Sequence, residues 1–445
     1  MGKSIPAVAV GQPISPGPRY LFLQGPNGPF FCQLARRLLS GGATVYRIHF
    51  NGGDAAFWSL RGALAIDYRQ GVEQWPEFVG QRLGDWQISD LVLFGDCRPL
   101  HRVAIGLARL RGVRVHVFEE GYLRPNWVTL EAHGVNRNSL LPKDPDWYRH
   151  VADGLAPPPP VQAVPGNFAR RAAEDVLYTL NLVVRAWLYP DYRTHRPWHP
   201  LVEYRAGARR FLFRAKIRRN AAIAVGQFLA DPRPYFLFPL QLHSDAQIRF
   251  HSPYGSMGKA IESVIESFAR HAPEHQRLVL TEHPLDCGVI DLKRIALTAA
   301  QAHGVADRLL FVEGGSPDAL LRRAGAVVTV NSTIGIVALG MNLPVAVLGA
   351  AIYAIPGLVH GGTLDDFWSR PQPPDAALFS AFHRVVLEQT QIGGSFYSVE
   401  GRHMAADGAA RRMQRAALSS ALVSGFDFAA PPEAPAAETT SIELG

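Results

Sequence analysis

The stretch from Val327 to Tyr353 limits most strongly what this chain can fold into. It reads as a β-branched run at 327–330, a polar turn at 331–333, a run of helix formers at 334–341 and a second apolar run at 344–348. Strand, turn, helix and strand in this order predict a buried βαβ unit with parallel strands. We therefore expect an α/β fold.

The polar turn of this unit, Asn331-Ser332-Thr333, is a candidate anion-binding site. Asn and Ser are frequent N-cap residues, and a helix N-terminus presents free N–H groups and a positive dipole to an anion. The turn would also lie at the carboxyl end of a buried strand, where α/β proteins bind ligands. A phosphate site is one interpretation and a simple helix cap at Ser332 is the other; this stretch alone does not separate them.

A membrane-spanning helix is a further alternative, because no Asp, Glu, Lys or Arg occurs from 325 to 364. A spanning helix needs about 20 mainly apolar residues in a row. Here Asn331, Asn342, Pro344 and the five glycines from Gly325 to Gly357 interrupt the run, whereas buried parallel strands commonly read as continuous apolar segments. We expect no membrane span.

Composition narrows the class of protein. The 445 residues are 47% hydrophobic and 19% charged, which suits a globular chain of two or three domains. Three cysteines lie far apart without a CxxC pair, so a reducing, cytoplasmic setting fits. The first 20 residues lack the apolar core of a signal peptide. A net charge of +7 predicts an anionic partner: a nucleotide-linked donor, an anionic lipid surface or nucleic acid.

The N-terminal part repeats a strand, a polar loop and a helix. The predicted strands at 20–24 and 90–94 end in loops that contain Asn27 and Asp96-Cys97-Arg98. Glycine-rich loops at strand ends are typical of nucleotide-binding domains, although no complete GxGxxG is present. The predicted strand at 113–118 ends in Glu119-Glu120-Gly121, and two adjacent carboxylates raise one another's pKa. This pair indicates a catalytic site; a solvated loop is the alternative.

The middle of the chain has an unusual composition. Residues 151–165 are proline-rich and predict a linker. Residues 204–219 carry seven Arg or Lys and no acid, interleaved with aromatic side chains. That mixture suits an anionic membrane surface, and a solvated helix between domains is the alternative. No recognised nucleic-acid motif accompanies the basic run, so we expect no nucleic-acid partner.

A second α/β set begins near Tyr235. Its predicted strands at 235–239, 277–280, 308–312 and 327–330 are each followed by polar residues, namely Gln241 and Asp245, His283-Pro284, Glu313, and Ser332-Thr333. The carboxyl ends of parallel strands share one edge of a sheet, so these side chains are expected along that edge. We interpret His283, beside a candidate anion site, as functional.

We divide the chain on this basis into six parts. They are an N-terminal tail (1–17), an N-terminal Rossmann-like domain with the acceptor and catalytic groups (18–165), a helical, basic-aromatic connecting region (166–230), a C-terminal Rossmann-like domain (231–400), a C-terminal helix (401–425) and a disordered tail (426–445). Two Rossmann-type α/β domains that face a central cleft suggest a GT-B-like glycosyltransferase.

Six segments allow a family to be named: FLQGPNGPFF (22–31), YRIHFNGGDAAFW (46–58), EEGYLRPNWVTLEAHGVN (119–136), PLQLHSDAQIRFHSPY (239–254), TEHPLD (281–286) and VNSTIGIVALGMNLPVAVLG (330–349). In this order, over most of residues 18–400, they resemble the capsular polysaccharide β-Kdo transferases of the KpsS/LipB type. The resemblance implies a retaining glycosyltransferase with CMP-Kdo as co-substrate, no cofactor and no bound metal. It also implies a phosphatidylglycerol-type acceptor at the inner face of the cytoplasmic membrane, where the first Kdo of the capsule linker is added.

The resemblance assigns roles to individual residues. Relatives retain configuration through a carboxylate nucleophile in a motif similar to Glu-Asp-Gly, and Glu120 stands at the matching position, with Glu119 as the alternative. His283 would contact the CMP phosphate and help its departure, and Ser332 and Thr333 would hold the same phosphate. The remaining expected donor ligands are Pro284, Gln241, Asp245, Asn331 and Glu313, the last for the ribose or base. The expected acceptor and sugar ligands are Asn27, Asp96, Arg98 and Arg124.

The acidic donor agrees with the positive charge of the chain. Kdo carries a carboxylate and CMP a phosphate, so Arg98, Arg124 and Arg249 are candidates for pairing with them. Expected partners besides donor and lipid are a second Kdo transferase and the capsule export machinery. A non-catalytic export or assembly scaffold of the same fold is an alternative function, as is a transferase with another acceptor or nucleotide sugar.

Overall fold

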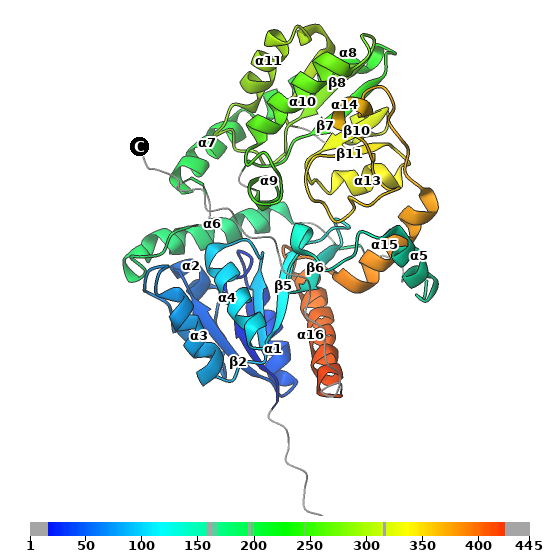
Figure 1. Cartoon of the computed structure of the whole chain (residues 1–445). Helices are drawn as coiled ribbons and strands as arrows, with labels where there is room; N and C mark the ends of the chain where they lie inside the picture. The colour runs from blue at the N-terminus through cyan, green and yellow to red at the C-terminus, as the bar shows by residue number, and fades with distance from the viewer. Residues whose placement is uncertain are drawn as a thin grey trace, which may run out of the picture.

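The computed structural model describes residues 17–157, 163–164, 167–194, 197–198, 200–243, 245–314 and 317–422. The predicted disordered tail at 426–445, nearly all of the predicted tail at 1–17 and part of the predicted linker lie outside these residues. Within them, two α/β domains lie one above the other, with the helix α6 (Phe168–Val184) between them (Figure 1). The predicted fold, two Rossmann-type domains of the GT-B kind, is confirmed.

The N-terminal domain contains a seven-stranded sheet of order β12-β6-β5-β4-β1-β2-β3. Strands β1 to β5 are mutually parallel, whereas β6 runs antiparallel to β5 and β12 antiparallel to β6. The strands are β1 (Arg19–Phe22), β2 (Thr44–His49), β3 (Leu64–Asp67), β4 (Asp90–Phe94), β5 (Arg114–Glu120), β6 (Trp127–Ala132) and β12 (Gln391–Gly393). The helices are α1 (Phe30–Ser40), α2 (Gly52–Ala56), α3 (Trp75–Asp85), α4 (Pro99–Leu110) and α16 (Val399–Leu422).

The C-terminal domain has a five-stranded parallel sheet of order β11-β10-β7-β8-β9. Its strands are β7 (Tyr235–Pro239), β8 (Arg277–Thr281), β9 (Leu309–Val312), β10 (Ala326–Thr329) and β11 (Val345–Val347). Its helices are α9 (Ala246–Arg249), α10 (Met257–His271), α11 (Leu292–Ala302), α12 (Asp318–Leu321), α13 (Ile334–Gly340), α14 (Leu364–Phe367) and α15 (Ala376–Thr390). The predicted βαβ unit is therefore present as β10, α13 and β11.

Four buried apolar clusters hold the two sheets between helices. In the N-terminal domain, α1 and α16 contribute to one cluster and α3 and α4 to another. In the C-terminal domain, α13 and α15 contribute to one cluster and α10 and α11 to another. Apolar residues recur three and four positions apart on these helices, so each buries one face against a sheet. Every central strand is buried on both sides, which explains the long apolar runs in the sequence.

The connecting region consists of helices that join the domains. Three longer helices follow one another, α6, α7 (Pro200–Leu212) and α8 (Arg214–Ala230), and α5 (Pro145–Asp153) precedes them. Three 3-10 turns complete the described helices: η1 (Asn136–Asn138), η2 (Ala186–Leu188) and η3 (Ala306–Arg308). Among the described residues, none of the helices combines the length and the apolar character needed to cross a bilayer.

Two segments of the chain belong to the other domain than the one to which the predicted division assigns them. Residues 391–400 fall in the predicted C-terminal domain, yet β12 pairs with β6 and α16 packs on α1, both in the N-terminal domain. Residues 145–153 fall in the predicted N-terminal domain, yet α5 packs on α15 through Tyr148 and Phe382. Pairing between segments this far apart in sequence depends on complementary buried surfaces, which a local pattern does not contain.

Candidate active site

Glu119 and Glu120 are the last two residues of β5, which begins one residue later and ends two residues later than predicted. The antiparallel strand β6 extends it, with Glu119 opposite Thr129 and Glu120 opposite Val128. Successive side chains of a strand point to opposite faces of the sheet. The two carboxyl groups therefore leave β5 in opposite directions, although both reach one cavity.

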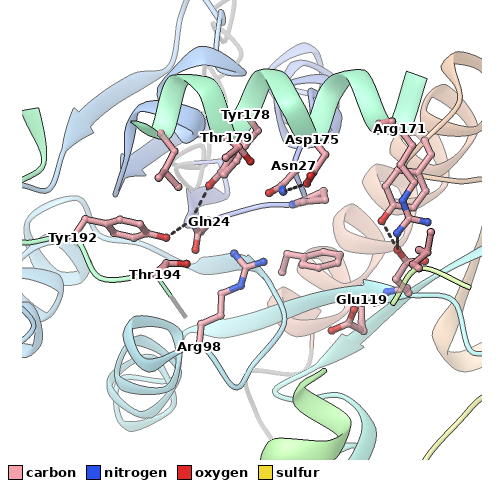
Figure 2. A pocket seen from close by; sticks show the side chains of 17 residues that line it. Gln24, Asn27, Arg98, Glu119, Arg171, Asp175, Tyr178, Thr179, Tyr192 and Thr194 are labelled. Carbon is pink, nitrogen blue, oxygen red and sulfur yellow. Dashed lines mark hydrogen bonds and ion pairs between the residues drawn. The ribbon is translucent and has the colours of Figure 1, made fainter. Parts of the chain in front are cut away.

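This main cavity has a volume of about 480 Å³. It brings together four of the predicted site residues, Asn27, Arg98, Glu119 and Glu120. Leu285, which follows His283-Pro284, reaches the cavity from the C-terminal domain. Its size is that of a small-molecule site, and its walls come from both domains and from α6 (Figure 2).

Glu120 is surrounded by groups that favour its charged form. The hydroxyl of Tyr397 donates a hydrogen bond to Oε1 of Glu120. Arg171 of α6 lies 3.7 Å from the same carboxylate, and Arg124 lies 3.9 Å from it. Two cations and a hydroxyl donor are thus directed at this carboxylate.

Glu119 has the opposite surroundings. Burial, with the nearby charges of Glu120 and Asp245, raises the pKa of Glu119 to about 7. The backbone N–H of Glu120 donates to Oε1 of Glu119 at 3.0 Å and partly offsets this effect. At neutral pH this carboxyl group can both take up and release a proton, as a general acid or base requires.

The helix α6 forms one wall of the main cavity. Figure 2 shows Arg171, Asp175, Tyr178 and Thr179 pointing from this helix toward the side where Arg98 lies. Asn27 donates to Asp175 at 2.7 Å. Tyr178 receives hydrogen bonds from Gln24 at 2.9 Å and from Asn51 at 3.1 Å, and it donates to Asp54 at 3.0 Å. These bonds fasten α6 to the loops after β1 and β2.

His283 lies in the loop after β8, close to the arginines that flank Glu120. Burial, together with the charges of Arg124 and Arg171, lowers the pKa of His283 to about 4. Nδ1 of His283 accepts a hydrogen bond from the backbone N–H of Leu285 at 3.1 Å. A neutral ring that accepts at Nδ1 carries its proton on Nε2, so His283 can donate a hydrogen bond from Nε2.

The other predicted donor ligands lie at strand ends of the C-terminal sheet. Gln241 follows β7 and accepts from the backbone N–H of Asn331 at 2.8 Å, while the Asn331 amide donates to the carbonyl of His251 at 2.9 Å. Ser332 accepts from the N–H of Ile334 at 3.2 Å, but it is not the N-cap residue of α13, so the interpretation of Ser332 as the helix cap is wrong. Thr333 occupies the N-cap position of α13, and Glu313 forms an ion pair with Lys293 at 2.6 Å. Pro284 is exposed in the loop next to His283.

A smaller cavity of about 180 Å³ lies between the domains. Asp96, Arg98 and Glu119 line it from one domain and Asp245 and Arg249 from the other. Asp96 accepts from the N–H of Val135 at 2.9 Å and from Asn138 at 3.0 Å. Asp96 thus holds the loop after β6. It lines this smaller cavity and is not among the residues that line the main cavity.

Asp96, Cys97 and His251 meet across this domain boundary. Sγ of Cys97 lies 3.2 Å from Oδ1 of Asp96 and 3.1 Å from Nε2 of His251, and the three groups form a possible metal-ligand set. Burial and the charge of Asp96 raise the pKa of the Cys97 thiol well above its ordinary value, which favours the protonated, hydrogen-bonding thiol. A second candidate for metal binding in the sequence is the Asp-x-Asp pattern at 144–146. There Asp144 is the N-cap residue of α5, and its side chain accepts from the N–H of Asp146.

A third cavity of about 380 Å³ adjoins the main one and shares Gln24, Arg98, Tyr192 and Thr194 with it. Its further lining includes the apolar side chains of Phe50, Val72 and Leu100. Arg98 therefore lies between the two cavities and lines both.

Sequence reasoning did not find the contribution of α6 or of Tyr397. Arg171, Asp175 and Tyr178 recur four and three positions apart, with Thr179 next to Tyr178, and this spacing is a signal that could have identified a polar face. For Tyr397 no comparable signal exists, because it follows β12, which reaches β6 only through long-range pairing.

Comparison with known proteins places these observations in a family. Residues 89–397 match the family described as capsule polysaccharide biosynthesis protein. The chain is 37% identical over 389 residues to the capsule polysaccharide export protein KpsS of Escherichia coli, covering 86% of this chain and 97% of the relative. It is 35% identical over 393 residues to the capsule polysaccharide modification protein LipB of Neisseria meningitidis, covering 85% and 91%.

Among solved structures, a β-Kdo 2,7 transferase, KpsC of Thermosulfurimonas dismutans, is similar with a TM-score of 0.41 and 16% identity. The match covers 90% of this chain and 99% of that one. The family predicted from the six sequence segments is confirmed by the extent and identity of the sequence matches. This chain belongs to the capsule polysaccharide biosynthesis protein family.

Proposed function

We propose that this protein is a retaining glycosyltransferase that moves Kdo from CMP-Kdo to a phosphatidylglycerol-type lipid and so starts the capsular polysaccharide linker. The observation that carries the proposal is the pair of carboxyl groups, Glu119 and Glu120, which share one cavity but have opposite surroundings. Membership of the capsule polysaccharide family supports a role in capsule assembly.

The reaction proceeds in two displacements. The Glu120 carboxylate attacks the anomeric carbon of Kdo, the bond from this carbon to the CMP phosphate oxygen breaks, and CMP leaves with the electron pair. The acceptor hydroxyl then attacks the same carbon, transfers its proton to Glu119 and releases Glu120 as a free carboxylate. Each displacement inverts the anomeric centre, so the product retains the configuration of the donor.

The surroundings of the two glutamates suit these separate tasks. A nucleophile must be ionised, and Arg171, Arg124 and Tyr397 stabilise the Glu120 anion. A general base must take a proton near neutral pH, which a pKa of about 7 allows for Glu119. The departing phosphate gains charge, and the Nε2–H of His283 supports it without requiring an imidazolium.

Anion recognition supports an acidic sugar donor. Arg98 and Arg171 line the main cavity, and an arginine is well suited to a carboxylate such as that of Kdo. Ser332 and Thr333 precede α13 at the edge of the sheet that also carries His283, where they would hold the CMP phosphate.

A lipid acceptor agrees with the third cavity and with the basic connecting helices. The partly apolar third cavity opens onto Arg98 and would receive the part of the acceptor next to its reacting hydroxyl. The exposed Arg and Lys residues of α7 and α8 suit the anionic surface that contains the acceptor. A position at the inner face of the cytoplasmic membrane, beside a second Kdo transferase and the export machinery, follows from this proposal.

The proposal is tested with freshly generated CMP-Kdo and a fluorescent phosphatidylglycerol or lysophosphatidylglycerol. Wild type is compared with Glu120→Gln and His283→Ala, and with Glu131→Gln as the matched control. Glu131 is a buried carboxyl group, the pKa of which burial also raises to about 7, but it contacts Tyr122 and Ser139 rather than the main cavity. We expect product from wild type and from Glu131→Gln and none from Glu120→Gln.

Two other outcomes would change the proposal. If wild type makes no product while CMP still raises its melting temperature, the donor sugar or acceptor is wrong and a transferase with other substrates replaces it. If neither turnover nor CMP binding is observed, the non-catalytic scaffold becomes the better account.

A further inference from the structure

The helix α6 has its polar side chains inside and its apolar side chains outside. On the inner face, Arg171 approaches Glu120, Asp175 accepts from Asn27, and Tyr178 takes part in the buried bonds to Gln24, Asn51 and Asp54. Arg402 donates to both carboxylate oxygens of Glu174 at 2.7 Å, and Arg170 donates to one of them at 3.3 Å. The inner face of α6 therefore lines the main cavity and bonds to the segments around it.

The opposite face of α6 is an exposed apolar stripe. It consists of Val176, Leu177, Leu180, Val183, Val184 and, in the turn that follows the helix, Trp187. The spacing of these residues places them on one side of a helix. Trp187 is 77% exposed, Val184 62% and Leu180 56%, so the rest of the described chain leaves them open to solvent. We call these six residues the α6 stripe.

This arrangement is the reverse of an ordinary surface helix, which buries its apolar stripe and exposes its polar side. The helix cannot turn over, because its inner face is held by the bonds to Asn27, Asp54 and Arg402. A contiguous exposed apolar stripe marks a surface that contacts a partner or a membrane.

The next helices add further apolar side chains and positive charge. Phe211 is 67% exposed and Leu212 79%, at the junction between α7 and α8. Arg205, Arg209, Arg218 and Arg219 are exposed on the same two helices. Tyr204 of α7 donates to Asp175 of α6 at 3.0 Å, so this basic segment is attached directly to α6. Apolar side chains next to arginines are complementary to an anionic lipid bilayer, in which phosphates surround an apolar interior.

We propose that the α6 stripe, with the Phe211–Phe213 junction, is the surface by which this protein docks on an anionic lipid bilayer. The inference deepens the proposed function, since it assigns the surface that would bring the main cavity to a lipid acceptor. With the stripe in the bilayer interface, Arg171 and Asp175 on the inner face of the same helix lie one helix diameter from the lipid headgroups. The main cavity would then receive an acceptor headgroup without extracting the whole lipid.

The experiment measures co-sedimentation of the full chain with vesicles, in the absence of any donor sugar. One set of vesicles contains phosphatidylcholine alone, and the other contains phosphatidylglycerol as roughly one third of the lipid. The test variant is Leu180→Gln/Val184→Gln/Trp187→Gln. The matched control is Leu110→Gln, which removes another exposed leucine (84% exposed) at the end of α4.

We expect the triple variant to bind the anionic vesicles about tenfold more weakly than wild type, since three apolar side chains no longer enter the interface. Leu110→Gln should bind as wild type does. Arg218→Gln/Arg219→Gln should weaken binding to the anionic vesicles and make it less sensitive to salt. Far-ultraviolet circular dichroism and a urea transition check that each variant is folded.

Equal binding by the triple variant and wild type would overturn the inference. It would also be overturned if wild type ignores the vesicles but self-associates in sedimentation velocity and the triple variant does not, because the stripe would then cover a second copy of the chain. Kdo transfer to a short-chain, water-soluble acceptor is measured separately. Its failure in wild type would count against the proposed function and leave the vesicle result unaffected.

Discussion

Glu119 and Glu120 are consecutive residues of β5, yet Glu120 contacts Arg171 and Tyr397 while Glu119 faces the boundary with Asp245. The alternation of a β-strand produces this separation, because neighbouring side chains leave on opposite faces. Two identical side chains thereby acquire different electrostatic surroundings without any change in residue type. The proposed division of labour between nucleophile and base rests on this geometry.

Replacement of Glu120 by glutamine should abolish turnover, since an amide is a far weaker nucleophile than a carboxylate. We expect kcat to fall by about a thousandfold or more. Glu119→Gln should instead slow the second displacement, so that Kdo accumulates on Glu120. Intact-mass spectrometry after incubation with CMP-Kdo would detect an adduct of one Kdo residue on Glu119→Gln but none on Glu119→Gln/Glu120→Gln. An adduct that persists in the double variant would show that Glu120 is not the nucleophile.

The pH dependence of turnover should report Glu119. As a base in the second displacement it is active when deprotonated, so kcat/KM for the acceptor should rise with pH through about 7, the pKa that burial gives this group. Glu119→Gln should lose this rise, whereas the control Glu131→Gln should keep it. A profile that is identical in wild type and Glu119→Gln would exclude Glu119 as the titrating base.

The same pKa predicts an effect on stability with a definite sign. Between its ordinary value and about 7, folded protein keeps a proton that the unfolded chain releases, so wild type loses stability as pH rises through this window. Glu119→Gln does not titrate and should be more stable than wild type at about pH 8, by at most about 3 kcal/mol. Urea titrations at about pH 5 and about pH 8 test this, since the difference between the two proteins should grow with pH.

His283 should act as a neutral hydrogen-bond donor. Because its pKa lies near 4, no loss of activity between pH 5 and pH 7 should come from protonation of His283. His283→Ala should lower kcat/KM for CMP-Kdo by about ten- to a hundredfold, the value of one hydrogen bond to a charged group. His283→Gln keeps a donor and should recover part of this loss. Equal activities of His283→Ala and wild type would remove this residue from the donor site.

The ion pair between Arg402 of α16 and Glu174 of α6 should contribute strongly to the packing of these two helices. Arg402 is 2% exposed and its Nη1 lies 2.7 Å from both carboxylate oxygens of Glu174. Arg402→Met leaves the mostly buried carboxylate of Glu174 with only the more exposed Arg170, at 3.3 Å, as a cation and should destabilise the fold by up to about 3–5 kcal/mol. Arg402→Met/Glu174→Gln should recover much of that loss, and Glu266→Gln, which removes the exposed ion pair to Arg270, should cost about 0.5 kcal/mol or less. Urea denaturation measures all three.

Turnover should not depend on a divalent cation, as the family resemblance implies. Dialysis against EDTA should leave kcat and KM unchanged, and Cys97→Ser should retain most of the activity because serine can also donate to Asp96. A loss of activity with EDTA that zinc or another cation reverses would identify Asp96, Cys97 and His251 as a metal site instead.

Local patterns in the sequence were sufficient for most of the elements. The strands at 90–94 and 235–239 match the predicted bounds. The strand predicted at 113–118 ends two residues later than predicted, because Glu119 and Glu120 are charged and only pairing with β6 keeps them in the ladder. The predicted order of strand, polar loop and helix also identified Glu119, Glu120 and His283 as candidates.

The sequence by itself therefore determined the two α/β domains, the polar residues at their strand ends and the family. Periodic burial and turn chemistry act over a few residues, so they can be read along the chain. Only the tertiary structure decided that α6 turns its polar face to the site, that Tyr397 reaches Glu120, and that burial raises the pKa of Glu119. These properties arise from contacts between distant segments and from the burial and charge that such contacts create, which no short stretch of sequence contains.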